Sequence, residues 1–309
     1  MPAHDQLIQE LHAEVAAGMV PESMDCLVKR LAPLADELRH KIPVIATGAR
    51  LFRIRKMNTM PHVVDEVGAP PPGVAPIGRL NDVGQVVLYL ADSPDTAFSE
   101  ARATTGEYCL SEWRVQQPKV ALANGGIPAD LLRTRFPNNF DSPGMAIGGK
   151  ENKQILSLFR ALYTLPVAQD ATDLYRWSIG CGFANGFSHL CERAAVETVG
   201  ETTILSGQYP FSGIAYPSVR KNKQSINYAF NDLGITYLRL DHVQWVERYG
   251  DGSVKGIDFA ASWDADGRIS WQGRPAHYQL QPGESSRVVK IAETLWSYES
   301  LDGGIPFFV

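Results

Sequence analysis

The sequence predicts an α+β fold, because helical and strand-like stretches come in blocks instead of alternating one by one. Helical patterns open the chain, mixed patterns follow to about residue 122, helical patterns return to about residue 198, and strand patterns occupy the rest. A doubly wound parallel sheet would require regular alternation of strands and helices. We therefore expect helices flanking a mixed sheet, with β-hairpins towards the C-terminus.

The first element expected is a pair of helices within residues 1–42. Apolar residues recur at helical spacing in two stretches, and Pro21 and Glu22 separate them. We expect this pair to pack against the following domain, which spans 43–309; a dimerisation or partner surface is the alternative.

Alternating apolar and basic residues at 51–55 predict a half-buried strand, and the apolar run 86–90 predicts a buried one. The four prolines within 68–76 predict a loop between them, because proline cannot join a strand ladder or a helix interior. Ser93 followed by Pro94 has the form of a helix N-terminus, so a helix is expected to run to about residue 104.

The later elements follow from the same periodicities. Strands are expected at 108–116, 119–122 and 213–216, and helices at 150–165 and 171–198. Three glycines are expected to break the last of these helices: Gly180, Gly182 and Gly186. Hairpin turns are expected at 249–253 and 264–267.

Composition excludes several classes of protein. The 309 residues include 29 Lys+Arg and 34 Asp+Glu, and the net charge of −5 argues against a basic nucleic-acid-binding domain. No apolar run approaches the roughly 18–20 residues of a membrane-spanning helix, and the N-terminus lacks the basic and apolar regions of a signal peptide. We expect a cytoplasmic protein with no nucleic-acid or membrane partner and reduced cysteines; the oligomeric state is left open.

Three residues stand out as carriers of chemistry: Arg79 in a loop, Tyr89 in a strand and Glu100 in the following helix. A guanidinium pairs with phosphate oxygens, a phenol ring stacks on a heterocycle, and a carboxylate stabilises developing positive charge. Each also has a simpler interpretation, as a surface ion pair, a core tyrosine and a solvated carboxylate respectively.

Other motifs predict no metal or nucleotide site. His189 and Cys191 are two ligands without a second pair. The segment 264–267 begins like a calcium loop but lacks the glutamate at position twelve. Gly148-Gly149-Lys150 lacks the spacing of a phosphate-binding loop.

Residues 78–100 resemble the RES family, named for its Arg, Glu and Ser. The matching residues are the GRxN turn Gly78-Arg79-Leu80-Asn81, the strand Leu88-Tyr89-Leu90-Ala91 and the SxxTAxxE segment from Ser93 to Glu100. Ser218 best matches the family serine, and Arg53 resembles an arginine of the family's first strand. The resemblance covers about 49–240, with a helical insertion within about 125–200 and a β-rich tail outside it.

The resemblance implies an ADP-ribosyltransferase-like split mixed sheet and an enzyme that consumes NAD⁺, as in bacterial toxin–antitoxin pairs. Arg79 would hold the phosphates, Tyr89 would pack against nicotinamide or its ribose, Glu100 would stabilise the oxocarbenium-like state, and Ser218 would orient a phosphate or ribose. Arg53 and Asn81 complete the implied NAD⁺-binding set. No prosthetic group or metal is implied, because the pyridinium is already a charged leaving group.

The expected activity is that of an NAD⁺ phosphorylase or glycohydrolase, with NAD⁺ as substrate and inorganic phosphate as co-substrate in the first case. A cognate antitoxin or immunity protein is the expected partner. Two alternatives remain open: transfer of ADP-ribose to a protein or nucleic-acid acceptor, and a non-catalytic module that binds NAD⁺, ADP-ribose or a partner.

Overall fold

The computed structural model describes most of the chain. The described residues are 2–21, 23–38, 43–136, 151–168, 172–186, 196–199, 202–205, 211–220, 225–273, 286–292, 295–300 and 307–308. They form two compact units that interleave along the sequence. The first unit comprises Met1–Ala49, Ala69–Leu90 and Val115–Leu238, and the second comprises Arg50–Gly68, Ala91–Arg114 and Arg239–Val309. The predicted domain boundary after residue 42 remains a prediction.

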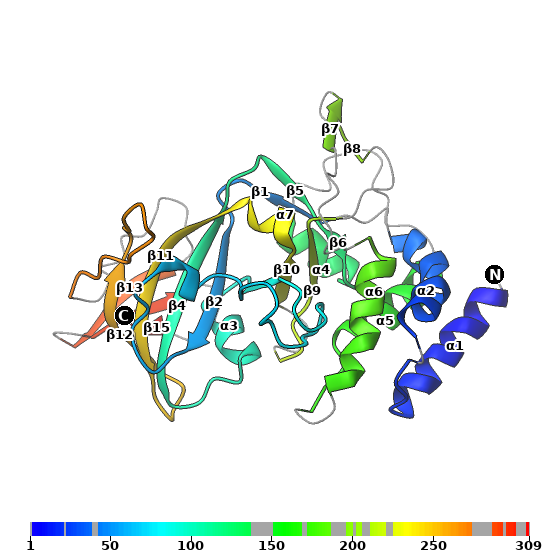
Figure 1. Cartoon of the computed structure of the whole chain (residues 1–309), viewed down its shortest axis with the longest axis horizontal. Helices are drawn as coiled ribbons and strands as arrows, with labels where there is room; N and C mark the ends of the chain where they lie inside the picture. Colours follow the sequence, from blue (N-terminus) through cyan, green and yellow to red (C-terminus); the bar gives the residue numbers. More distant parts are fainter. Residues whose placement is uncertain are drawn as a thin grey trace. The chain divides into compact units, whose positions relative to one another are not determined.

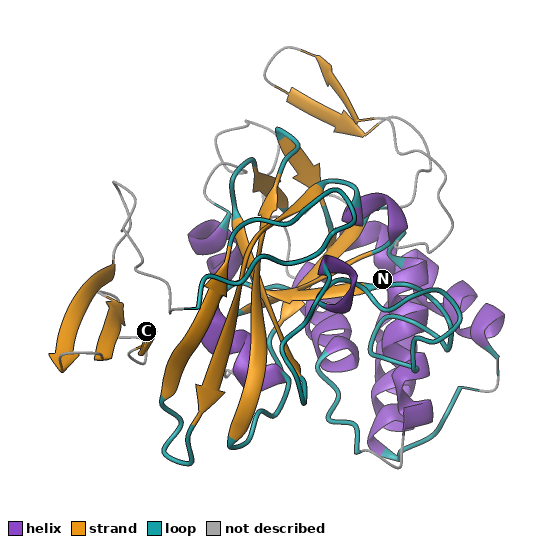
Figure 2. Ribbon diagram, turned by 60° about the vertical axis from the view of Figure 1, so that its left-hand side comes forward, coloured by secondary structure: helices purple, strands orange, loops and turns teal. Residues whose placement is uncertain are grey.

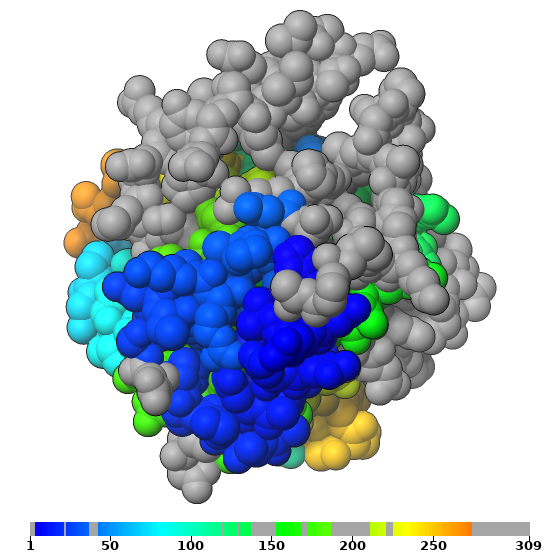
Figure 3. All heavy atoms as spheres, turned by 90° about the vertical axis from the view of Figure 1, so that its right-hand side faces the viewer, coloured from blue at the N-terminus to red at the C-terminus, as the bar shows by residue number. Residues whose placement is uncertain are grey.

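Helices α1 (Pro2–Ala16) and α2 (Met24–Leu38) pack in the first unit against α5 (Glu151–Tyr163) and α6 (Tyr175–Ala184) (Figure 1). The inner side of the N-terminal pair is apolar, and Leu11, Leu31 and Leu34 are fully buried there. The outer side of the pair forms a continuous surface (Figure 3). The expected packing against the remainder of the chain is therefore confirmed.

The interior of α6 depends on one glycine. A Cβ on Gly180 would overlap the side chain of Leu27 in α2, so the two helices approach closely there. Gly180 and Gly182 consequently lie within the helix, and the expectation that they break it is wrong. The helix ends before Gly186, whose φ of +84° suits a turn.

The strands of the first unit are short. β1 (Val44–Ala46) pairs antiparallel with β5 (Lys119–Ala121), and β9 (Gly213–Pro217) pairs antiparallel with β10 (Ile226–Phe230) and parallel with β6 (Ala123–Asn124). The other elements are α4 (Ala129–Arg135), the 3₁₀ helix η3 (Thr172–Leu174), β7 (Val196–Val199), β8 (Thr202–Leu205) and α7 (Asp232–Ile235).

The second unit is built on an antiparallel ladder. Its strands are β2 (Arg50–Lys56), β4 (Gly106–Val115), β11 (Leu238–Arg248) and β12 (Val254–Ala260), in the order β12-β11-β4-β2. Helix α3 (Pro94–Glu100) packs on β2, where Phe98 joins an apolar cluster with Phe52 and Ile54.

A short 3₁₀ helix, η1, spans Val64–Glu66. A separate antiparallel sheet contains β13 (Ser286–Ala292), β14 (Leu295–Ser300) and β15 (Phe307–Phe308). Mixed and antiparallel pairing with helices grouped apart establishes the predicted α+β class (Figure 2).

Three predicted boundaries differ from the structure. β3 (Leu88–Ala91) begins at Leu88, not Val86. The helix that begins at Pro94 ends at Glu100, four residues early, because Arg102 adopts a left-handed φ of +50°. The prediction that a helix reaches residue 198 is wrong, because strand β7 begins at Val196. Residues 187–195 lie outside the described residues. Valine and threonine dominate that strand and favour extended backbone.

Candidate active site

The candidate site begins with the turn Gly78–Asn81, which is closed by the side chain of Tyr89. The Gly78 N–H donates to the Asn81 carbonyl at 2.9 Å, and the Leu80 N–H donates to the Tyr89 hydroxyl at 2.7 Å. That hydroxyl in turn donates to Asn81 Oδ1 at 2.8 Å. Asn81 is buried, and its amide donates to the carbonyls of Pro76 and Asp82. The turn is therefore held rigidly from within.

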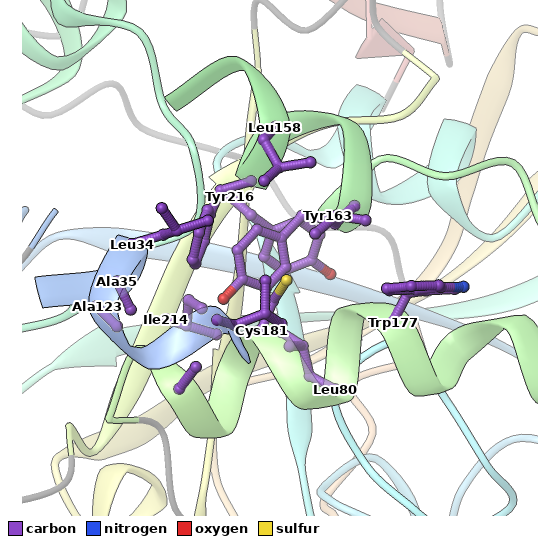
Figure 4. Packing of buried hydrophobic residues seen from close by; sticks show 14 of the residues in the cluster. Leu34, Ala35, Leu80, Ala123, Leu158, Tyr163, Trp177, Cys181, Ile214 and Tyr216 are labelled. Carbon is purple, nitrogen blue, oxygen red and sulfur yellow. The ribbon is translucent and has the colours of Figure 1, made fainter. Parts of the chain in front are cut away.

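Glycine is required at the start of this turn. A Cβ on Gly78 would lie 2.5 Å from Asn81 Oδ1 and 3.1 Å from the Tyr89 hydroxyl, so any larger residue would displace the hydrogen bonds that close the turn. Leu80 also fixes the turn, since it is fully buried in the same apolar cluster as Tyr163 (Figure 4). Arg79 lies between these two anchors.

The guanidinium of Arg79 caps the C-terminus of α5. Its Nη1 donates to the carbonyl of Tyr163 at 2.7 Å and to that of Leu165 at 3.1 Å. Carbonyls at a helix C-terminus lack intrahelical donors and carry partial negative charge, so a cation is favoured there. Among the described residues no acceptor binds Nε or Nη2 of Arg79. These two nitrogens are the donors that an anionic ligand would use.

Two residues of α6 also contact Arg79. The buried Ser178 hydroxyl donates to the Arg79 carbonyl at 2.5 Å, and the guanidinium carbon lies 5.4 Å from the centroid of the Tyr175 ring. These residues were missed by the sequence analysis. Nothing in the sequence of α6 distinguishes them from other helical residues, because their partner lies about a hundred positions away.

Ser218 belongs to the same unit and directly follows β9. It is fully buried, its N–H donates to the Ser225 carbonyl at 2.7 Å, and its hydroxyl accepts the Arg220 N–H at 3.2 Å. The first of these bonds joins the residue that follows β9 to the residue that precedes β10. The predicted contact of Ser218 with a phosphate or ribose remains a prediction.

Glu100 and Arg53 belong to the second unit. Glu100 is the last residue of α3, Arg53 lies on β2, and both side chains are half-buried. Because α3 packs on β2, the structure brings these two residues onto adjacent elements. The predicted set thus divides into Arg79, Asn81, Tyr89 and Ser218 in the first unit, and Arg53 and Glu100 in the second.

The second unit holds a buried ionic network that the sequence analysis did not identify. Glu112, whose side chain is 1% exposed, receives two hydrogen bonds of 2.8 Å from Arg50 and lies 3.3 Å from Arg114. Arg114 also pairs with Asp241 at 3.1 Å. The sequence signal was Glu112 and Arg114, two charged residues at alternate positions in the half of β4 that also carries Trp113 and Val115.

Within the described ranges, one group of three side chains has metal-ligand geometry: Glu112, Asp241 and His242. His242 Nδ1 lies 3.3 Å from Asp241, and its Nε2 lies 3.7 Å from Glu112. The hydrogen bond from His242, with help from Arg114, lowers the pKa of Asp241 to about 2. Arginines already occupy both carboxylates, so the chemistry is that of an ion-pair network and not of a cation site.

The described cysteines are free thiols: Cys26, Cys109 and Cys181. Burial raises the pKa of Cys109 to about 12 and that of Cys181 well above its ordinary value. Both remain protonated at neutral pH, so neither suits a nucleophile. Cys191 lies outside the described residues, as do His189 and 148–150.

None of the described helices has both the length and the apolar character needed to cross a bilayer.

Comparisons with known proteins give little similarity. No family model matches the chain, and no curated protein matches it. Among solved structures, the chain is similar to one described as the crystal structure of the M. tuberculosis MbcT-MbcA toxin-antitoxin complex. The match has 13% identity and a TM-score of 0.33, and it covers 71% of this chain and 93% of that one.

Proposed function

We propose that the chain is an NAD⁺-degrading enzyme that cleaves the bond between nicotinamide and ribose. We further propose that it acts as a toxin in the cytoplasm and that a cognate antitoxin or immunity protein neutralises it. The observation that carries the proposal is the fixed guanidinium of Arg79, whose Nη1 is bound to carbonyls at the end of α5 while Nε and Nη2 have no acceptor among the described residues. The choice of NAD⁺ as the proposed substrate comes from the resemblance of residues 78–100 to the RES family.

The proposed chemistry requires few groups. The glycosidic bond breaks and its electron pair leaves with nicotinamide, which neutralises the pyridinium. Positive charge develops on the ribosyl ring, where the carboxylate of Glu100 stabilises it. An oxygen of phosphate or water then attacks the ribosyl carbon, and attacking water releases a proton to solvent. Arg79 binds the substrate phosphates, with Arg53, Asn81, Tyr89 and Ser218 forming the remainder of the proposed NAD⁺ site.

The test is a time course of purified protein with NAD⁺, with and without millimolar phosphate, followed by NMR. Phosphate-dependent release of nicotinamide with ADP-ribose-1″-phosphate identifies a phosphorylase, and release with ADP-ribose alone identifies a glycohydrolase. Labelled NAD⁺ that marks a macromolecule identifies a transferase instead. Calorimetric binding of NAD⁺ without any product identifies a non-catalytic module and overturns the proposal.

A matched pair of variants controls the assignment of Arg79. Arg79→Ala is expected to lose NAD⁺ turnover at low substrate concentration, whereas Arg268→Ala, at a side chain that is 72% exposed, is expected to retain it. Thermal melting establishes that both variants fold. Equal turnover by the two variants would remove Arg79 from the site.

A further inference from the structure

We infer that helix α6 positions Arg79 for anion binding, with Ser178 and Tyr175 as the positioning residues. The inference rests on the proposed function, because it deepens the role given there to Arg79. Neither residue belongs to the turn or to the strand that follows it, so their contribution comes from the fold of the inserted helices. Helix α6 contacts both the backbone and the guanidinium of Arg79, and α6 is itself held by the N-terminal segment.

Ser178 fixes the backbone of Arg79. Its side chain is 1% exposed, and its hydroxyl faces the Arg79 carbonyl at 2.5 Å and the Tyr175 carbonyl of its own helix at 3.0 Å. A hydroxyl has one proton, and the shorter contact is the one that joins the helix to the turn. The backbone of Arg79 is therefore bound to α6 through its carbonyl, independently of the hydrogen bonds inside the turn.

Tyr175 fixes the guanidinium. Its ring centroid lies 5.4 Å from the guanidinium carbon, within the range of a cation–π contact, while Nη1 is held by the carbonyls of Tyr163 and Leu165. Arginine has many rotamers when unrestrained, and ordering it upon binding weakens affinity. A guanidinium that is already restrained by a ring and two carbonyls avoids most of that loss.

Helix α6 is itself held in place by contacts with the N-terminal segment. Trp177 is buried, and its indole N–H donates to the Met19 carbonyl at 2.8 Å, between α1 and α2. Gly180 allows Leu27 of α2 to lie directly against the helix backbone. Residues on both sides of Ser178 are thus anchored, so movement of Tyr175 and Ser178 relative to the turn is restricted.

The kinetic test compares Ser178→Ala and Tyr175→Leu with the conservative variants Ser178→Thr and Tyr175→Phe. Loss of one positioning contact is expected to raise the KM for NAD⁺ about fivefold, with kcat changed less than twofold, because phosphate binding is uniform between substrate and transition state. The conservative variants are expected to keep KM near the parental value. Thr134→Ala is the control, since it removes an exposed hydroxyl–carbonyl bond within α4.

A second readout does not depend on turnover. ¹⁵N relaxation of the Arg79 Nε–H group, assigned by its disappearance in Arg79→Lys, measures how tightly the guanidinium is held. The order parameter is expected to fall in Tyr175→Leu and to remain high in Tyr175→Phe. An unchanged order parameter and an unchanged KM in both Ser178→Ala and Tyr175→Leu would overturn the inference. If the parent protein leaves NAD⁺ intact, the proposed function fails, and the relaxation data still decide whether α6 holds Arg79.

Discussion

The hydroxyl of Tyr89 accepts the backbone N–H of Leu80 at 2.7 Å, which ties a strand residue to the tip of the turn that carries Arg79. The same hydroxyl donates to Asn81 at 2.8 Å, so its removal leaves one donor and one acceptor without partners. We predict that Tyr89→Phe lowers the free energy of unfolding by about 1–3 kcal/mol, as measured by urea denaturation. Tyr249→Phe, at an exposed tyrosine whose hydroxyl donates to Glu247, should cost less than about 0.5 kcal/mol. Equal values for the two variants would show that the hydroxyl does not pin the turn.

The N-terminal helices are predicted to be required for folding and not to restrain the site. Leu11, Leu27, Leu31 and Leu34 are each at most 2% exposed, and burial of a leucine is worth about 2 kcal/mol. Their summed contribution approaches the whole stability of an ordinary domain, about 5–15 kcal/mol. Deletion of residues 1–38 should abolish the cooperative thermal transition seen by circular dichroism. A folded truncated protein with faster NAD⁺ turnover would instead show that the helices are inhibitory.

The ionic network of the second unit predicts a specific loss of stability in acid. The pKa of Asp241 is lowered to about 2 in the folded protein, below its ordinary value near 4, so the ionised carboxylate stabilises the fold above pH 4. This contribution is lost as the pH falls from 4 through 2. Urea midpoints of the parent and of Asp241→Asn should differ at pH 7 and converge towards pH 2. Asp266→Asn, at an exposed carboxylate, should show no such convergence.

A strained residue, Arg102, lies just beyond the end of α3, two positions after Glu100. Arg102 has a φ of +50°, and the Ala103 N–H donates to the Phe98 carbonyl at 3.0 Å, as in a Schellman motif, where glycine is usual. We predict that Arg102→Gly raises the free energy of unfolding by about 0.5–1 kcal/mol. Ala101→Gly, at a residue with right-handed φ, should lower it instead. If both substitutions changed the free energy of unfolding in the same direction in denaturation experiments, the backbone of Arg102 would not be strained.

The sequence predicted elements wherever the signal was local. Ser93 accepts the Thr96 N–H at 3.2 Å and Pro94 opens the helix, as their order in the sequence indicated. The end of that helix was missed because an arginine, not a glycine, adopts the left-handed conformation. Gly180 was misjudged because its neighbour Leu27 is 153 positions away and the packing between helices has no local signature.

The site was predictable only in part, for the same reason. The turn, the tyrosine and the glutamate lie within 23 residues, so a local pattern was enough to nominate them, and their role in a site stays a prediction. The carbonyls that hold Arg79 are 84 and 86 positions from it, and the serine that fixes its backbone is 99 positions away. Such partners follow from how the inserted helices fold back on the turn, which periodicity alone does not determine.

The most direct measurement is the kcat of NAD⁺ cleavage by Glu100→Gln. This substitution keeps the shape of the side chain and removes the charge that we propose stabilises the developing ribosyl cation. The account predicts a loss of about 100-fold or more in kcat, with a thermal transition near that of the parent. Glu107→Gln, at an exposed glutamate of β4, should retain the parental kcat. Parental turnover by a folded Glu100→Gln variant would contradict the account.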